Sequence, residues 1–157
     1  MVAAYDSFNY LAYWQGREYE HESEIIAIKA FFKKIPDKLK ILDIGCGFGR
    51  LTPYYTPKSK TIILSDPSAK ILEKARKRFQ SNKKLSFLQS NLENLPKKLP
   101  RTSFDLILLI RVLHHINNPD KAFNVVQRLL SSKGYFILEF PNKLHWKALL
   151  LNLLQGN

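Results

Sequence analysis

Cysteine is nearly absent from this chain: Cys46 is the only one among 157 residues. A lone cysteine closes no intramolecular disulfide, which excludes a disulfide-stapled scaffold and favours a reducing, cytoplasmic setting. The opening residues lack the charged and then apolar layout of a secretory signal. No apolar run reaches the roughly 18 residues that a membrane-spanning helix needs. We therefore expect a cytoplasmic protein with no membrane span.

Acidic residues are scarce: 13 Asp and Glu stand against 25 Lys and Arg, for a formal net charge of +12. This excess favours an anionic cofactor, a nucleic acid or an acidic membrane surface as partner, and charge alone does not choose among them. Hydrophobic residues make up 45% of the chain and charged residues 24%, which is close to globular usage. A disordered or collagen-like chain is thereby excluded, and a single globular domain is expected.

Short apolar runs alternate with amphipathic segments along the chain. The runs predict strands over residues 40–44, 61–64, 85–89, 104–110 and 135–140. Helical periodicity predicts helices over residues 23–35, from about 50 onward, 69–80, 121–130 and 144–154, with Ser68 and Gly134 as caps. The alternation predicts an α/β fold: a doubly wound, mostly parallel sheet with helices on both faces and with 104–110 at its centre.

Glycine is concentrated at one place, Gly45, Gly47 and Gly49, between the first predicted strand and the next helix. Glycine permits positive φ and lets a ligand approach the backbone, while a helix start supplies unpaired N–H groups. In an open α/β sheet this place lies at the carboxyl ends of the strands, where ligands bind. Asp66 ends the next strand, about 20 residues after Asp43, where an acidic side chain can accept both hydroxyls of a ribose. The pattern predicts a nucleoside-type ligand. The alternative is that no ligand binds, in which case the loop is only a tight turn and Asp66 only caps the following helix.

The glycines alternate with single residues, whereas the dinucleotide fingerprint has the spacing G-x-G-x-x-G. The loop also lacks the lysine and serine pair that binds a triphosphate. A nicotinamide oxidoreductase is therefore disfavoured.

Five segments in order, ILDIGCGFGRL, IILSDPSAKILEKAR, LSFLQSNLENLP, FDLILLIRVLHHI and GYFILEF, resemble the motifs of the class I S-adenosylmethionine-dependent methyltransferases, especially the type 11 group. The resemblance implies a Rossmann-like core over residues 39–142 that binds S-adenosylmethionine and releases S-adenosylhomocysteine. It implies methyl transfer to a small-molecule or lipid acceptor. Residues 1–38 are then expected to form a helical lid segment, and residues 143–157 an apolar C-terminal helix.

The resemblance also assigns cofactor-binding residues. Asp43 is expected near the methionine portion of the cofactor, and Asp66 at the ribose hydroxyls. In the glycine loop, the expected contacts are Gly45, Cys46, Gly47 and Gly49. Pro67 and Ser68 are expected to flank the adenine, Asn91 to contact its amino group and Leu92 to cover its edge. Ile110 and Arg111 are expected at the amino-acid end of the cofactor, and Tyr13 and Arg17 are expected to contact it from the lid.

Three of these assignments carry particular expectations. The family often has an aspartate where Asn91 stands, so the adenine amino group would meet an amide carbonyl. Arg111 stands where many relatives have a small or polar residue, and its guanidinium could pair with the carboxylate of the cofactor or of an acidic substrate. The aromatic segment around Tyr13 either folds over the cofactor or packs on the sheet edge.

Catalytic residues are not evident, because methyl transfer from an activated sulfonium needs positioning and desolvation more than an acid or a base. His114 and His115 are the candidates for a base, with a structural role for His115 and a surface role for His114 as the alternative. Their spacing gives no case for a metal site. Cys46, at an expected helix start where a thiol pKa tends to fall, is not expected to be a nucleophile.

Relatives usually add two strands after the fifth, and this chain has no signal for a sixth. We therefore expect a truncated fold, in which the apolar residues of 144–154 pack against a missing C-terminal portion or a second copy. Two other functions stay open. An RNA or protein methyltransferase would use the positive charge, although nucleic acid is not expected because no aromatic and basic platform is evident. A non-catalytic S-adenosylmethionine-binding module would bind the cofactor in this pocket without transferring its methyl group.

Overall fold

The computed structural model describes residues 10–100 and 103–141. Its strands are β1 (Leu39–Ile44), β2 (Ser59–Asp66), β3 (Leu85–Gln89), β4 (Phe104–Ile110) and β5 (Leu130–Glu139). Its α-helices are α1 (Tyr10–Tyr13), α2 (Glu18–Phe32), α3 (Thr52–Tyr55), α4 (Ala69–Arg78), α5 (Leu95–Lys98) and α6 (Pro119–Leu129). Three 3-10 turns, η1 (Thr56–Lys58), η2 (Leu92–Asn94) and η3 (Leu113–His115), connect them.

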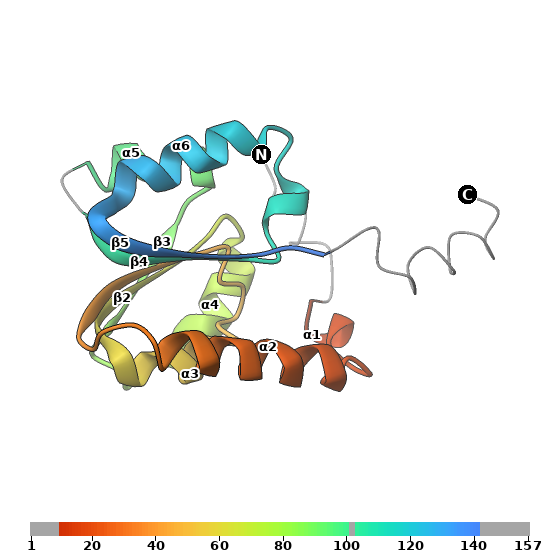
Figure 1. The fold of residues 1–157 in the computed structure, drawn as a ribbon. Coiled ribbons are helices and arrows are strands. Elements are labelled where there is room, and N and C mark those ends of the chain that lie inside the picture. The colour runs from red at the N-terminus through yellow and green to blue at the C-terminus, as the bar shows by residue number, and fades with distance from the viewer. Residues whose placement is uncertain (1–9, 101–102, 142–157) are drawn as a thin grey trace.

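The five strands form one parallel sheet in the order β3-β2-β1-β4-β5 (Figure 1). The chain runs outward from β1 to β3 and then returns to the other side of β1, so the strand order reverses between β1 and β4. The carboxyl ends of these two strands therefore border a crevice, which is where open α/β sheets bind ligands. The predicted doubly wound parallel sheet is confirmed.

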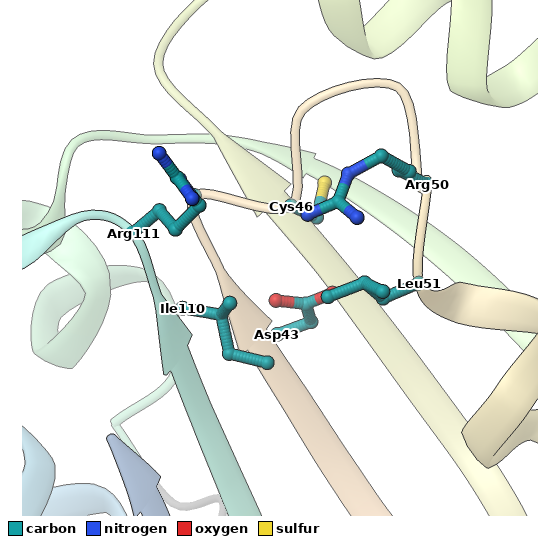
Figure 2. Close-up of a pocket in the computed structure, with 7 residues that line it drawn as sticks. Asp43, Cys46, Arg50, Leu51, Ile110 and Arg111 are labelled. Atoms are coloured by element: carbon teal, nitrogen blue, oxygen red, sulfur yellow. The ribbon is translucent and has the colours of Figure 1, made fainter. Parts of the chain in front are cut away.

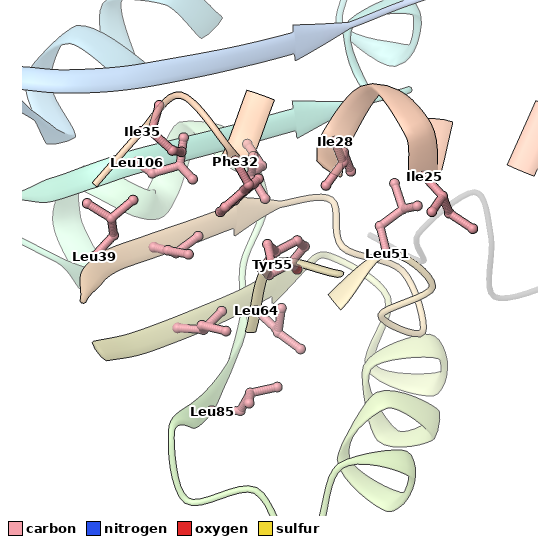
Figure 3. Packing of buried hydrophobic residues seen from close by; sticks show 13 residues of the cluster. Ile25, Ile28, Phe32, Ile35, Leu39, Leu51, Tyr55, Leu64, Leu85 and Leu106 are labelled. Atoms are coloured by element: carbon pink, nitrogen blue, oxygen red, sulfur yellow. The ribbon is translucent and has the colours of Figure 1, made fainter. Parts of the chain in front are cut away.

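Helices cover both faces of the sheet, as predicted. Helices α5 and α6 lie on one face, and α2, α3 and α4 lie on the other (Figure 1). Each face has its own apolar cluster. On the α2 face, Ile25, Ile28 and Phe32 point from one stripe of the helix toward β1 and pack with the fully buried Tyr55 (Figure 3). The stripe holds α2 against the sheet and sets where the start of that helix lies above the crevice.

Strand β4 is the centre of the hydrophobic core. Its residues Leu106, Ile107, Leu108 and Leu109 are fully buried, because helices lie over both of its faces. The uniformly apolar run 104–110 predicted this position, and β4 has the bounds that the run predicts. Strand β3 likewise coincides with its predicted bounds, and Ser68 caps α4 by accepting a hydrogen bond from the Ile71 N–H at 3.2 Å.

Two predicted helix ends are wrong. The helix expected from about residue 50 is a single turn, α3, which the 3-10 turn η1 follows. Pro57 explains the interruption, because proline lacks the N–H that a continuing helix needs. Gly134 caps no helix: α6 runs directly into β5 at Leu130, whose ψ of 139° is extended, and Gly134 lies inside that strand.

The α2 prediction was displaced along the chain, since the helix begins at Glu18 and ends at Phe32 rather than spanning 23–35. The predicted C-terminal helix over 143–157 lies outside the described residues. Within the described part of the chain, no helix is long and apolar enough to cross a membrane.

Candidate functional site

The glycine loop between β1 and α3 is the first element of the site. Gly45, Gly47 and Gly49 have φ values of +73°, +57° and +73°, in the left-handed region that favours glycine. A Cβ on Gly45 would lie 2.3 Å from Cγ2 of Val112, which follows β4. Glycine at position 45 therefore lets the loop lie directly against the segment that leaves β4.

The amides of this loop are used within the protein. The N–H groups of Gly45 and Cys46 donate to the carbonyl of Ser65 at 2.7 and 3.0 Å, and that of Gly47 donates to Asp66 Oδ2 at 2.9 Å. The end of β2 thus accepts the hydrogens of these three N–H groups. A one-turn helix after the loop adds no anion site. The loop thus provides close backbone contact rather than donors for a phosphate.

Asp66 is held at the end of β2 by two backbone donors. Its Oδ1 accepts from the Ser68 N–H at 2.8 Å, its Oδ2 accepts from Gly47, and the residue is 6% exposed. It lines a cleft of about 500 Å³, open side included, together with Gly45, Pro67, Ile110, Val112 and His115. A carboxylate oxygen can accept more than one hydrogen bond, which suits Asp66 to a ligand that bears hydroxyl donors.

A second cleft, of about 350 Å³ with its open side, lies on the other side of Gly45. Figure 2 shows the side chains that reach it from β1, the glycine loop and the end of β4: Asp43, Cys46, Arg50, Leu51, Ile110 and Arg111. Gly45, Ile110 and Arg111 line both clefts. The two clefts are therefore parts of one site that spans the boundary between β1 and β4.

Asp43 is a buried carboxyl in the second cleft. It accepts a hydrogen bond from the Tyr55 hydroxyl, which is also 2.9 Å from Oγ1 of Thr52. Burial raises the pKa of Asp43 to about 7, and the charge of Asp66 adds to the rise, while the Tyr55 hydrogen bond and Arg50 oppose it. A cationic group of a ligand placed here would favour the ionised carboxylate.

Two arginines meet one glutamate above this cleft. Glu24 of α2 is 9% exposed, pairs with Arg50 through Oε2, and accepts from Arg111 Nη1 through Oε1 at 3.1 Å. The Arg50 guanidinium also lies 3.5 Å from the centre of the Trp14 ring. Arg111 has a φ of +57°, and its backbone N–H donates to the carbonyl of Glu139 at 2.9 Å. Helix α2 thereby ties the glycine loop to the end of β4.

The structure places the two predicted lid residues differently. Tyr13 reaches the site, since its hydroxyl accepts a hydrogen bond from Arg111 Nη2 at 3.1 Å. Arg17 lies 4.3 Å from the centre of the Tyr13 ring and pairs with Glu20 at 3.7 Å, and it lines neither of the two clefts. Arg17 therefore contacts Tyr13 rather than lining the clefts.

Three further candidates lie beside the clefts rather than in their walls. Asn91 is exposed, and its Oδ1 accepts from the Asn94 N–H at 3.2 Å as the cap of η2. Leu92 is half-buried and packs against the apolar cluster on the α6 face. Ser68 is fully buried and is used as the cap of α4.

The histidines and the cysteine have separate surroundings. His115 lines the cleft that contains Asp66, and its ring centre is 3.8 Å from that of its neighbour His114. Burial lowers the pKa of His115, which favours the neutral ring. Burial raises the pKa of the Cys46 thiol, contrary to the fall expected at a helix start, because no helix begins until Thr52. Within residues 10–100 and 103–141, no three His, Cys, Asp or Glu side chains are grouped to hold a metal ion.

Sequence reasoning missed Glu24, Arg50 and Val112 as parts of the site. Arg50 could have been found, because it directly follows the last glycine of the loop. Glu24 gave a weaker signal: it is the last acidic residue before an apolar stretch of α2. Val112 is a valine among many, and only the fold brings it against Gly45.

Comparison with known proteins is consistent with this architecture. Residues 42–138 match the family described as "Methyltransferase domain". The 5-methylorsellinic acid synthase of Aspergillus terreus is 29% identical over 137 residues, which cover 82% of this chain and 5% of that protein. The ubiquinone biosynthesis O-methyltransferase of Pelagibacter ubique is 31% identical over 121 residues, 74% of this chain and 49% of that one.

Among solved structures, an S-adenosylmethionine-dependent methyltransferase from Thermotoga maritima has a TM-score of 0.66 and 27% identity, over 84% of this chain and 57% of that chain. The chain thus spans about half of the length of this methyltransferase and of the ubiquinone enzyme. The family match covers more than half of the chain and includes the glycine loop, Asp66 and the end of β4. The chain therefore belongs to the class I S-adenosylmethionine-dependent methyltransferases, the family whose cofactor is S-adenosylmethionine and whose product from it is S-adenosylhomocysteine.

Proposed function

We propose that this protein transfers a methyl group from S-adenosylmethionine to a small-molecule or lipid acceptor. One observation carries the proposal: two connected clefts meet at Gly45, with Asp66 in one and Asp43 with two arginines in the other. S-adenosylmethionine has a neutral nucleoside at one end and a zwitterionic amino acid at the other. The carboxylate of Asp66 suits the ribose hydroxyls of the first end. Asp43 and the two arginines are opposite in charge to the ammonium and carboxylate groups of the second end.

The cleft with Asp66 fits the adenosine. The carboxylate is fixed by Gly47 and Ser68, and each of its oxygens can accept more than one hydrogen bond, which suits it to the ribose hydroxyls. The loop would meet the nucleoside through the backbone at Gly45, where any side chain would collide with Val112. Asn91 and Leu92 remain the proposed contacts of the adenine, although they do not line the cleft that Pro67 borders.

The cleft with Asp43 fits the amino-acid end. A guanidinium has five N–H donors, and Glu24 and Tyr13 engage two of those of Arg111, so donors remain for a carboxylate. Asp43 would accept from the ammonium group. The N–H groups of Gly45, Cys46 and Gly47 are engaged within the protein, which argues against a pyrophosphate that would need such donors, and so against a dinucleotide.

The chemistry requires little from individual side chains. When bound, the cofactor supplies a methyl group that is already activated by a sulfonium. The chain's part is to fix the two ends of the cofactor, to orient the acceptor and to exclude water. Tyr13 and Trp14, which contact the two arginines, are placed to cover the amino-acid end.

The finer features of the proposal follow from the sequence. We propose the lid, core and C-terminal helix as three parts over residues 1–38, 39–142 and 143–157, a cytoplasmic location, and a homodimer or a further C-terminal portion that covers the apolar residues of 144–154. The ubiquinone biosynthesis O-methyltransferase supports an acceptor of low molecular weight.

Calorimetric titration of S-adenosylhomocysteine tests the proposal. We expect binding by the unaltered chain and a loss of about tenfold or more in affinity for Asp66→Ala, since each hydrogen bond to a charged group is worth about 1.5 to 3 kcal/mol. Asp37→Ala is the matched control, because Asp37 is exposed and pairs only with Lys58. Equal affinity of the Asp66→Ala variant, or preferential binding of NAD, would overturn the proposal.

A further inference from the structure

A third cleft adjoins the two that we assign to the cofactor. It lies between α2 and the strands β4 and β5, with a volume of about 680 Å³ that includes its open mouth. Its principal lining residues are Glu24, Ala27 and Phe31 from α2, Ile110 from β4, and Ile137 and Glu139 from β5. Ile110 lines all three clefts, so this groove opens directly beside the amino-acid end of the cofactor site.

Glu139 is the acid of this groove with an unused oxygen in the described part of the chain. Both carboxylate oxygens of Glu24 are engaged, by Arg50 and by Arg111. Oε2 of Glu139, in contrast, is buried and has no hydrogen-bond partner within the described residues. A buried polar atom without a partner destabilises the protein, so a hydrogen-bond donor from a ligand would be favourable at this oxygen.

The position of Glu139 is fixed by the sheet. Its Cα pairs with that of Ile110 in the register of β4 and β5, and its carbonyl accepts from the Arg111 N–H. Glu139 therefore stands at the carboxyl end of the sheet, next to the two residues that border the cofactor clefts. A group held by its side chain would lie in the groove with its reacting atom toward Ile110.

The charges around Glu139 decide which ligand suits the groove. Burial raises the pKa of Glu139, and the neighbouring Glu24 adds to the rise, while Arg111, Arg50 and the Arg111 N–H oppose it. Two carboxylates at one end disfavour an acidic ligand there. Apart from Ser23, the remaining lining residues are apolar, so the groove suits an apolar body that bears a hydrogen-bond donor.

We infer that this groove is the acceptor subsite, and that it takes an apolar molecule whose nucleophile is an amine N–H or a hydroxyl O–H held by Glu139 Oε2. The inference rests on the proposed methyl transfer and names its substrate class. In the transfer, the lone pair of the nitrogen or oxygen forms the bond to the methyl carbon. The sulfur keeps the electron pair of the bond that breaks, and the N–H or O–H proton passes to Glu139 and then to water.

Binding without turnover tests the inference. The complex with S-adenosylhomocysteine is titrated with two donor compounds, para-butylphenol and para-butylaniline. Each has a matched control that lacks the hydrogen-bond donor: the methyl ether of the phenol and the N,N-dimethyl derivative of the aniline. We expect at least one donor compound to bind about tenfold or more tightly than its methylated counterpart. The phenol and aniline arms then distinguish a hydroxyl acceptor from an amine.

Substitutions in the groove test where the donor compounds bind. Glu139→Gln is expected to lower the preference for the donor compound, and Ala27→Phe to block binding by filling the groove, while both keep their affinity for S-adenosylhomocysteine. Glu73→Gln, at an exposed acid of α4, is the matched control and should bind as the unaltered chain does. Donor binding should also weaken as the pH falls through the raised pKa of Glu139, and Glu139→Gln should remove that dependence.

The outcomes distinguish a failure of this inference from a failure of the proposed function. If S-adenosylhomocysteine binds but neither donor compound does, or if Glu139→Gln binds them as the unaltered chain does, the inference is overturned and the cofactor site stands. If S-adenosylhomocysteine itself does not bind, the proposed function fails and the inference fails with it.

Discussion

Gly45 and Val112 lie so close that a Cβ on the glycine would be 2.3 Å from Cγ2 of the valine. The contact joins the loop after β1 to the segment after β4, across the place where the strand order reverses. It therefore couples the two halves of the site. The close approach depends on a residue without a side chain at position 45.

Gly45→Ala is expected to destabilise the protein by about 2 to 4 kcal/mol. Positive φ in alanine costs about 1 kcal/mol, and overpacking costs about 1 to 3 kcal/mol more. Urea unfolding measures the loss. Val112→Ala in the same chain should restore part of it by removing Cγ2. If the double variant is no more stable than Gly45→Ala, the contact with Val112 is not the cause.

The stability of the protein without ligand should depend on Asp43 between about pH 4 and pH 7. The folded-state pKa of this group, about 7, lies above the ordinary value of 3.8, so its contribution is fully present below pH 4 and is lost as the pH rises through 7. The loss is at most about 4 kcal/mol. Urea unfolding across this range should give a slope for the unaltered chain that Asp43→Asn reduces. Equal slopes would contradict the raised pKa.

Glu24→Ala is expected to cost about 3 kcal/mol in the free energy of unfolding, because it leaves two largely buried guanidinium groups, of Arg50 and Arg111, without their carboxylate. Glu20→Ala is the control on the same helix. Its ion pair with Arg17 is about 40% exposed, so its removal should cost less than about 1 kcal/mol. Similar losses for the two variants would show that Glu24 does not hold the site together.

The positive charge should give only weak, salt-sensitive binding to RNA. The net charge of +12 attracts phosphates, but such attraction falls steeply as salt displaces the contacts. Lys70, Lys74 and Lys77 are exposed on α4, where their charged groups face the solvent. Filter binding at rising salt measures the effect. Retention of one RNA sequence over others at high salt would favour an RNA methyltransferase instead.

The fold was predictable where periodicity decides the structure. The run 104–110 is apolar because β4 is covered on both faces, and Ser68 caps α4 because its oxygen can accept from the helix start. The order of strands and helices likewise predicts the parallel sheet. Helix ends were less predictable, because Pro57 and the extended backbone at Leu130 stop or redirect the chain locally.

The site was predictable only as far as local motifs reach. The glycines and Asp66 show their roles through spacing along the chain. Glu24, Arg50 and Arg111 form a cluster from three separate segments, and no spacing rule brings residues 24 and 111 together. The use of the loop amides by Ser65 and Asp66 is also a product of strand pairing, so it could not be read from the glycines alone.

The most direct test of the central claim is an amide chemical-shift map of the isotope-labelled protein during titration with S-adenosylhomocysteine. Our account predicts that the largest shifts fall at Gly45, Gly47, Ser68 and Arg111, while Phe123 of α6, which lines neither cleft, stays unchanged. Saturating shifts confined to that set would place the cofactor across the two clefts. The absence of shifts there, or a cluster of shifts on α6, would contradict the account.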